Sequence, residues 1–216
     1  MDKMITITAA DGHSLDAYFV KAQGIQRGAI VLIQEIFGLT EQLQSVAQQY
    51  AIAGFDVMVP ALFDRVAPAT VVPFSEPKKG LALVEQCSTD GVLLDIQAAK
   101  EALAAPRVSV VGFCWGGGLA LLAAGRLSLY KGVAYYGTRL SRYLNAPLNC
   151  PFQFHFAELD THSPAALIEQ IQTQLPFAEC HLYAGVDHAF TNQYKPAFDE
   201  AATKLAMQRT VAFLSD

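Results

Sequence analysis

The chain of 216 residues lacks any apolar run long enough to span a bilayer, and only 16% of its residues are charged. Its few basic residues are scattered and the net charge is −5, which does not favour a nucleic-acid or anionic membrane surface. We therefore expect neither nucleic acid nor membrane as a partner. Because no CxxC or HExxH spacing occurs, we also expect no metal and no cofactor.

Disulfide and secretion signals are equally scarce. The four cysteines are widely spaced, and the first residues are typical of a strand rather than of the apolar core of a secretion signal. Free thiols in a reducing compartment are the expectation. The sequence thus predicts a cytoplasmic protein, either a monomer or a small homo-oligomer.

Hydrophobic residues make up 52% of the chain, enough for a sizeable core. Strand-like runs alternate with helical stretches, which predicts an α/β fold with a mostly parallel sheet of about eight strands and helices on both faces. Asp11-Gly12 predicts an antiparallel hairpin at the N-terminus. The predicted strands are 4–8, 15–20, 28–34, 55–59, 107–113, 132–136, 152–157 and 179–184.

The predicted helices cover 41–53, a long region ending near 105, and then 116–125, 164–174 and 196–214. Thr89-Asp90-Gly91 is a possible break in the long region, and Ser163 is the expected N-cap of the helix that starts at Pro164. Residues 60–79 carry four prolines and predict an irregular surface excursion that is a candidate lid. No linker or repeat is present, so we expect a single domain over 1–216.

The segment from Val108 to Gly118 runs from an apolar strand into a helix of small residues, with Cys114 at the turn. Gly112 and Gly116 flank the cysteine at the two positions where a nucleophile elbow needs small residues. The N-terminus of the predicted helix carries a partial positive charge next to Cys114, which would also favour a thiolate. The pattern predicts an α/β-hydrolase with a cysteine nucleophile. The alternatives are a buried structural cysteine and a phosphate-binding loop, although no Gly-Lys-Ser/Thr follows.

A cysteine nucleophile needs a base and a carboxylate that orients the base. His188 and His162 each follow a late strand, and Asp160 precedes both in the order that α/β-hydrolases use. We therefore predict a triad of Cys114, Asp160 and His188, with Asp187 as a competing acid. The remaining histidines lie in the hairpin or within strands and are expected to be structural: His13, His155 and His181.

Four segments in this order resemble the dienelactone hydrolase family (carboxymethylenebutenolidases): 34–39, 112–117, 156–160 and 185–190. The resemblance covers nearly the whole chain. It implies an α/β-hydrolase fold and hydrolysis of a small ester or lactone through a thioester on Cys114. The family's cysteine, aspartate and histidine fall on Cys114, Asp160 and His188, and its thiol-contacting glutamate falls on Glu35.

Glu35 follows a buried apolar strand, where a carboxylate is costly unless it is paired. A solvated residue or a structural ion pair is the alternative to a functional role. A carboxylate beside the sulfur opposes a thiolate, so the resting thiol would stay neutral until substrate shifts the glutamate, as the resemblance implies. The expected oxyanion hole consists of the backbone N–H groups of Ile36 and Trp115.

The chain departs from the family at the two arginines that hold the carboxylate of dienelactone. Asn192 stands where one is expected, and the region of the other offers Lys78 and Lys79, which lack the bidentate fork of arginine. Specificity for dienelactone is therefore not expected. An apolar pocket is predicted instead, with core packing as the alternative for each of its residues: Phe37, Phe63, Trp115 and Phe190.

Two further functional hypotheses remain open. A flavodoxin-like cysteine protein of the DJ-1 type also pairs a glutamate with a cysteine in a strand–helix elbow, but it would not require Asp160 and His188. A catalytically silent hydrolase fold that binds a small molecule would keep the fold and lose turnover. The order of the motifs along the whole chain favours the hydrolase over both.

Overall fold

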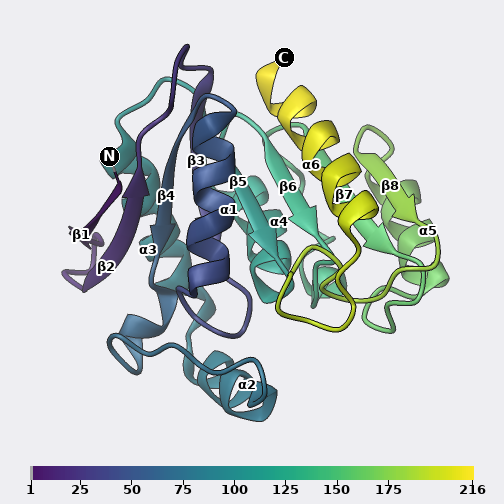
Figure 1. Cartoon of the computed structure of the whole chain (residues 1–216), viewed down its shortest axis with the longest axis horizontal. Coiled ribbons are helices and arrows are strands. Elements are labelled where there is room, and N and C mark those ends of the chain that lie inside the picture. The colour runs from purple at the N-terminus through teal and green to yellow at the C-terminus, as the bar shows by residue number, and fades with distance from the viewer. Residues whose placement is uncertain (1) are drawn as a thin grey trace. The chain divides into compact units, whose positions relative to one another are not determined.

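The computed structural model describes residues 2–216 (Figure 1). These residues form two compact units, one ending at Ser109 and the other spanning Val110–Asp216. The prediction of a single domain over 1–216 stays a prediction. No helix within the described residues combines the length and the apolar character that crossing a membrane requires.

The first unit is built on four strands in the order β1-β2-β4-β3, with antiparallel pairing of β1 with β2 and of β2 with β4 and parallel pairing of β3 with β4. The expected hairpin joins β1 to β2, and its Gly12 has a φ of +84°. Helices α1 and α3 cover opposite faces of these strands (Figure 1). The bounds are β1 Asp2–Thr8, β2 Ser14–Val20, β3 Gly28–Ile33, α1 Glu41–Ile52, β4 Phe55–Pro60 and α3 Thr89–Leu103.

The long helical region of the sequence is two helices, α2 (Pro77–Gln86) and α3. The break lies at Cys87 and Ser88, so the expected break at Thr89-Asp90-Gly91 is two residues too late. The physical reason is the N-cap: the hydroxyl of Ser88 accepts a hydrogen bond from the backbone N–H of Gly91 at 3.1 Å. The three residues of the expected break are therefore the first turn of α3.

The excursion between β4 and α2 begins with a short 3₁₀ helix, η1 (Leu62–Arg65), and then runs irregularly to α2. It packs against the loop that follows β3. The N–H of Val72 donates to the carbonyl of Phe37 at 2.9 Å, and a Cβ added to Gly80 would overlap the carbonyl of Ile36. Residue 80 must therefore be glycine for α2 to lie this close to residues 36–38.

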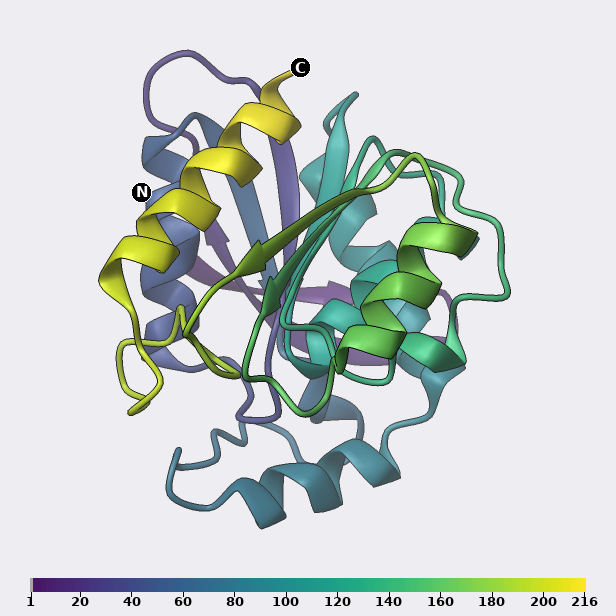
Figure 2. The same ribbon diagram turned by 90° about the vertical axis from the view of Figure 1, so that its right-hand side faces the viewer.

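The second unit contains a fully parallel set of strands in the order β5-β6-β7-β8. In Figure 2, the yellow helix α6 lies on one side of β7 and β8 and the green helix α5 on the other. The bounds are β5 Val108–Phe113, α4 Trp115–Arg126, β6 Gly132–Tyr135, η2 Leu140–Arg142, β7 Phe152–Ala157, α5 Ala165–Gln174, β8 Glu179–Tyr183 and α6 Glu200–Ser215.

Two helix starts differ from the sequence prediction. Helix α5 has Pro164 as its N-cap instead of Ser163, because the extended backbone of the proline (ψ 157°) delays the first helical residue to Ala165. Helix α6 begins at Glu200 instead of Pro196, because the carboxylate of Asp199 caps it by accepting from the N–H of Ala202 at 2.7 Å. The alternation of strands and helices, the parallel strands and the N-terminal hairpin agree with the predicted α/β class.

A buried hydrogen-bond network fixes α6 to the strands of the second unit. His155 on β7 contacts the hydroxyl of Tyr183 through Nδ1 at 2.8 Å and the hydroxyl of Thr210 on α6 through Nε2 at 2.9 Å. Thr210 also bonds the hydroxyl of Tyr135 on β6 at 2.6 Å. Burial, followed by the positive charges of His181 and Arg209, holds the pKa of His155 well below its usual range.

The buried position of His155 in this network predicts that the folded protein loses stability at acidic pH. An unfolded histidine binds a proton near pH 6.5, whereas the folded chain keeps His155 neutral, so the unfolded state binds more protons as the pH falls below about 6.5. Below that pH, the extra proton bound by the unfolded state should lower the free energy of unfolding by about 1.4 kcal/mol for each pH unit. The measurement is the free energy of unfolding in urea, for the wild type and for His155→Gln. The difference between the two proteins should be about 1 kcal/mol smaller at about pH 5.5 than at about pH 7. A pH-independent difference would contradict the prediction.

Candidate active site

Cys114 lies in a strained turn between β5 and α4. Its backbone has φ 54° and ψ −116°, a conformation that costs a non-glycine residue on the order of 1–3 kcal/mol. The N–H of Cys114 donates to the carbonyl of Tyr135 at 3.0 Å, and its own carbonyl accepts from Thr138 at 2.9 Å. A Cβ added to Gly112 would overlap the carbonyl of Gly116. The strand and the helix thus hold the thiol in the elbow that the glycine spacing predicts.

Asp160 follows β7, and its side chain is fully buried. Its Oδ2 lies 2.7 Å from Nδ1 of His188, and its Oδ1 accepts from the backbone N–H of His162 at 2.8 Å. Both carboxylate oxygens are therefore occupied. Asp187 bonds differently, since its Oδ1 accepts from the backbone N–H of His188 at 2.6 Å. In this geometry it is Asp160 that orients the imidazole ring.

The loops that carry Asp160 and His188 are joined to each other. The N–H of Leu159 donates to the carbonyl of Val186 at 3.0 Å, and the N–H of Gly185 donates to the carboxylate of Glu158 at 2.7 Å. Both loops start at the carboxyl ends of neighbouring parallel strands. These two hydrogen bonds between the loops thus help to fix the short distance between the carboxylate and the imidazole.

The imidazole of His188 also hydrogen-bonds the thiol of Cys114. Burial alone would lower the pKa of His188, but the hydrogen bonds and negative charges of Asp160 and Cys114 raise it to about 10. At neutral pH the ring therefore holds its proton. The thiol of Cys114 and the imidazole of His188 are therefore close enough to exchange a proton.

Tyr136 is a residue of this site that the sequence analysis did not single out. It is fully buried directly after β6, with a φ of +37°. The edge of its ring packs against His188 at 5.1 Å between centroids, and its hydroxyl bonds that of Thr191 at 2.8 Å. No local pattern could have indicated this role, because Tyr136 reads as the last apolar residue of a strand.

Five residues of the predicted site lie in the first unit, on or beside the loop after β3 or on α2: Glu35, Ile36, Phe37, Phe63 and Lys78. Glu35 is buried with 6% exposure, which argues against a solvated strand end but fits both a functional role and a structural ion pair. Phe37 packs edge-on against Phe74 at 4.8 Å, and Phe63 is buried within η1. Lys78 is exposed. The roles of these residues toward Cys114 stay predictions.

Phe190 and Asn192, which follow His188, are both fully buried. Phe190 packs between Tyr136 and Tyr183, with ring centroids 5.6 Å and 5.0 Å away. The side-chain oxygen of Asn192 accepts from the backbone N–H of Tyr194 at 3.1 Å, which forms a local turn. Asn192 therefore shapes the loop after His188 at the position where the family resemblance led us to expect arginine.

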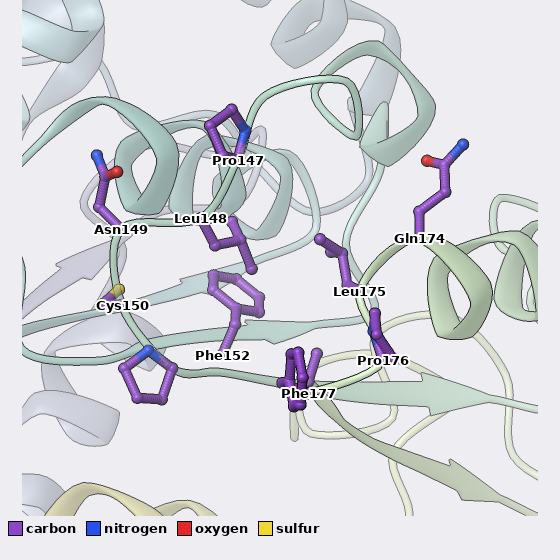
Figure 3. A pocket seen from close by; sticks show the side chains of 11 residues that line it. Pro147, Leu148, Asn149, Cys150, Phe152, Gln174, Leu175, Pro176 and Phe177 are labelled. Atoms are coloured by element: carbon purple, nitrogen blue, oxygen red, sulfur yellow. The ribbon is translucent and has the colours of Figure 1, made fainter.

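An apolar cavity of about 560 Å³ lies elsewhere in the second unit, lined by residues 147–152 and 174–178 (Figure 3). These segments precede β7 and β8, so the cavity lies at the amino ends of the strands. Cys114, Asp160 and His188 instead follow the carboxyl ends of β5, β7 and β8. The cavity is thus separate from the candidate active site.

One group of side chains near the site has metal-ligand chemistry. Asp160, His162 and His188 each offer one ligand atom, and these atoms lie within 4.8 Å of one another. No short motif spacing marks this group in the sequence, because Asp160 and His162 lie in one loop and His188 lies in another.

Comparison with known proteins covers almost the whole chain. The model of the dienelactone hydrolase family matches residues 15–216. Carboxymethylenebutenolidase 1 of Cupriavidus pinatubonensis is 32% identical over 225 residues, which cover 98% of this chain and 95% of that protein.

Solved structures agree with these sequence matches. A Klebsiella pneumoniae protein assigned to the dienelactone hydrolases superposes with a TM-score of 0.84 at 26% identity, with 99% of both chains covered. The alpha/beta hydrolase GrgF from Penicillium has a TM-score of 0.72 at 13% identity, with 99% of this chain and 98% of GrgF covered, and shows the fold alone. The predicted α/β-hydrolase fold is confirmed. From its sequence and its fold, this chain belongs to the dienelactone hydrolase family, and it is a hydrolase.

Proposed function

We propose that the protein hydrolyses small esters or lactones by covalent catalysis, with Cys114 as nucleophile, His188 as acid and base, and Asp160 as the carboxylate that orients His188. The observation that carries this proposal is the unbroken chain of contacts from Asp160 through His188 to Cys114. Family membership supplies the substrate class, because enzymes of this family act on small ester or lactone substrates.

The proposed reaction has two halves. The thiolate of Cys114 attacks the carbonyl carbon, and the alkoxide that leaves takes the proton of His188, which gives a thioester and a neutral imidazole. His188 then removes a proton from water, and the hydroxide attacks the thioester carbonyl. The acid product leaves, and the thiolate–imidazolium pair is restored.

Charge that develops on the carbonyl oxygen needs hydrogen-bond donors. Trp115 lies in the first turn of α4, where N–H groups point out of the helix end, directly after the nucleophile. We propose its N–H as one donor and that of Ile36 as the second. The contact of α2 at Gly80 with the carbonyl of Ile36 supports this, because it fixes the peptide plane next to the proposed donor.

Glu35 is proposed to regulate the thiol. A buried carboxylate next to the sulfur would disfavour the thiolate that His188 favours, so the two residues would compete for control of the thiol proton. Substrate that displaces the carboxylate would then leave the reactive thiolate beside His188. This arrangement would also limit oxidation of the resting thiol, which requires thiolate character.

The substrate is proposed to be uncharged. Asn192 forms a local turn, and Lys78 is an exposed lysine without a bidentate fork, so neither matches a carboxylate-binding arginine.

The four cysteines are free thiols in the described residues, which supports a reducing, cytoplasmic location. Family membership argues against the flavodoxin-like alternative. The experiment described next tests the alternative of a catalytically silent hydrolase fold.

We predict that p-nitrophenyl acetate or a small uncharged lactone leaves an acyl group on the protein that intact mass spectrometry detects. Cys114→Ala should abolish the adduct and lower kcat/KM roughly a thousandfold or more, because the nucleophile is gone. His188→Ala should cause a loss of similar size. Cys180→Ala, which removes a half-buried thiol whose pKa burial raises to about 11, is the matched control and should react normally. No adduct and no turnover with any substrate of the panel would favour the silent fold.

A second prediction concerns Glu35. Glu35→Gln removes a negative charge from beside the proposed thiolate, so iodoacetamide should alkylate Cys114 several-fold faster near neutral pH, with the pH profile shifted to lower values. Glu41→Gln changes an exposed carboxylate on α1 and should leave the rate unchanged. Equal rates and equal pH profiles for all three proteins would refute the contact.

A third prediction concerns Tyr136. Its hydroxyl holds the loop of His188 through Thr191, so Tyr136→Phe should lower kcat about tenfold while KM changes little. Tyr135→Phe is a matched control, because its hydroxyl is equally buried but bonds Thr210 on α6. Both variants should lose about 1 kcal/mol of stability. Equal kcat values in the two variants would show that Tyr136 has only a structural role.

A further inference from the structure

His162 has an unusual position for a residue with no part in the proposed reaction. Its ring is exposed and lies 4.9 Å from the ring of His188, with a 60° angle between the planes. Its backbone N–H is bound to Asp160, which fixes the start of the side chain, but its ring nitrogens form no hydrogen bond within residues 2–216. A ligand nitrogen is therefore available next to the proposed acid and base.

The three side chains match the requirements of one kind of ion. Two imidazoles and a carboxylate are borderline ligands that suit Zn²⁺ or a similar transition metal, whereas Mg²⁺ and Ca²⁺ prefer oxygen alone. Ligand atoms of a tetrahedral zinc site are about 3.3 Å apart. The atoms present here lie within 4.8 Å of one another. Oδ2 of Asp160 and Nδ1 of His188, now 2.7 Å apart, would have to separate by a fraction of an ångström, and the exposed His162 would approach by side-chain rotation.

We propose that Asp160, His162 and His188 form an inhibitory site for a borderline-soft divalent cation, with Zn²⁺ as the representative ion. The nitrogen of His188 that faces Asp160 is Nδ1, so the ion would replace the proton between them and release it to solvent. Metal on Nδ1 leaves Nε2 protonated, and the ring no longer accepts a proton from water. The cation therefore stops the reaction without touching Cys114.

This inference rests on the proposed function only for its inhibitory effect, because occupancy of the site can be measured without turnover. Isothermal titration calorimetry of tag-free Cys114→Ser with zinc chloride measures binding in the absence of the active-site thiol. We expect one binding event, weakened about tenfold or more when His162→Gln is added. His181→Gln is the matched control, because His181 lies on β8 beside Glu179 and Gln153, outside the three-residue group, and its loss should leave binding unchanged.

Inhibition is measured in parallel with wild type and His162→Gln. Zinc should inhibit the wild type at least about tenfold more strongly than the variant, while magnesium inhibits neither. Absent zinc binding, or binding that His162→Gln does not change, would overturn the proposed site. Inhibition of equal strength in both proteins would also overturn it and point to capture of zinc by the thiol. If no substrate is turned over, calorimetry still decides whether the site exists.

Discussion

The hydrogen bond between Asp160 and His188 depends on the register of two parallel strands, and much of the site depends on that bond. β7 and β8 pair Ala157 with Tyr183 at their carboxyl ends, so the loops that follow begin at the same level. A slip by one residue would displace one loop by about 3.3 Å, more than the 2.7 Å contact tolerates. The network around His155 on the same strands protects this register by tying them to α6.

Backbone strain is present where the chemistry is proposed. Cys114, Tyr136 and Ala189 all have positive φ values, and they follow β5, β6 and β8 in turn. Each such residue costs on the order of 1 kcal/mol or more, which the surrounding packing must offset. The strands that precede Cys114 and Tyr136, β5 and β6, are completely buried, so a rigid core holds these two strained turns in place. The strain fixes the direction of each side chain.

Strong local signals made most of the fold predictable from sequence. The buried strands are continuous apolar runs, and the elbow at Cys114 follows from the spacing of its glycines. Helix starts were less predictable, because Ser88 and Asp199 act as caps within stretches that also suit a longer helix. Tyr136 was missed for another reason: its positive φ and its contact with His188 arise from tertiary packing. Glu35 was identified through family resemblance, since the pattern alone also fits a solvated strand end.

The close approach of Gly80 to the carbonyl of Ile36 has a consequence for how such an enzyme can diversify. Gly80 lies where α2 approaches the loop after β3, while most other positions of the helix are exposed. Those positions can accumulate substitutions without disturbing this close approach. Helix α2 can thus acquire new surface chemistry over evolutionary time while the backbone beneath it keeps its shape.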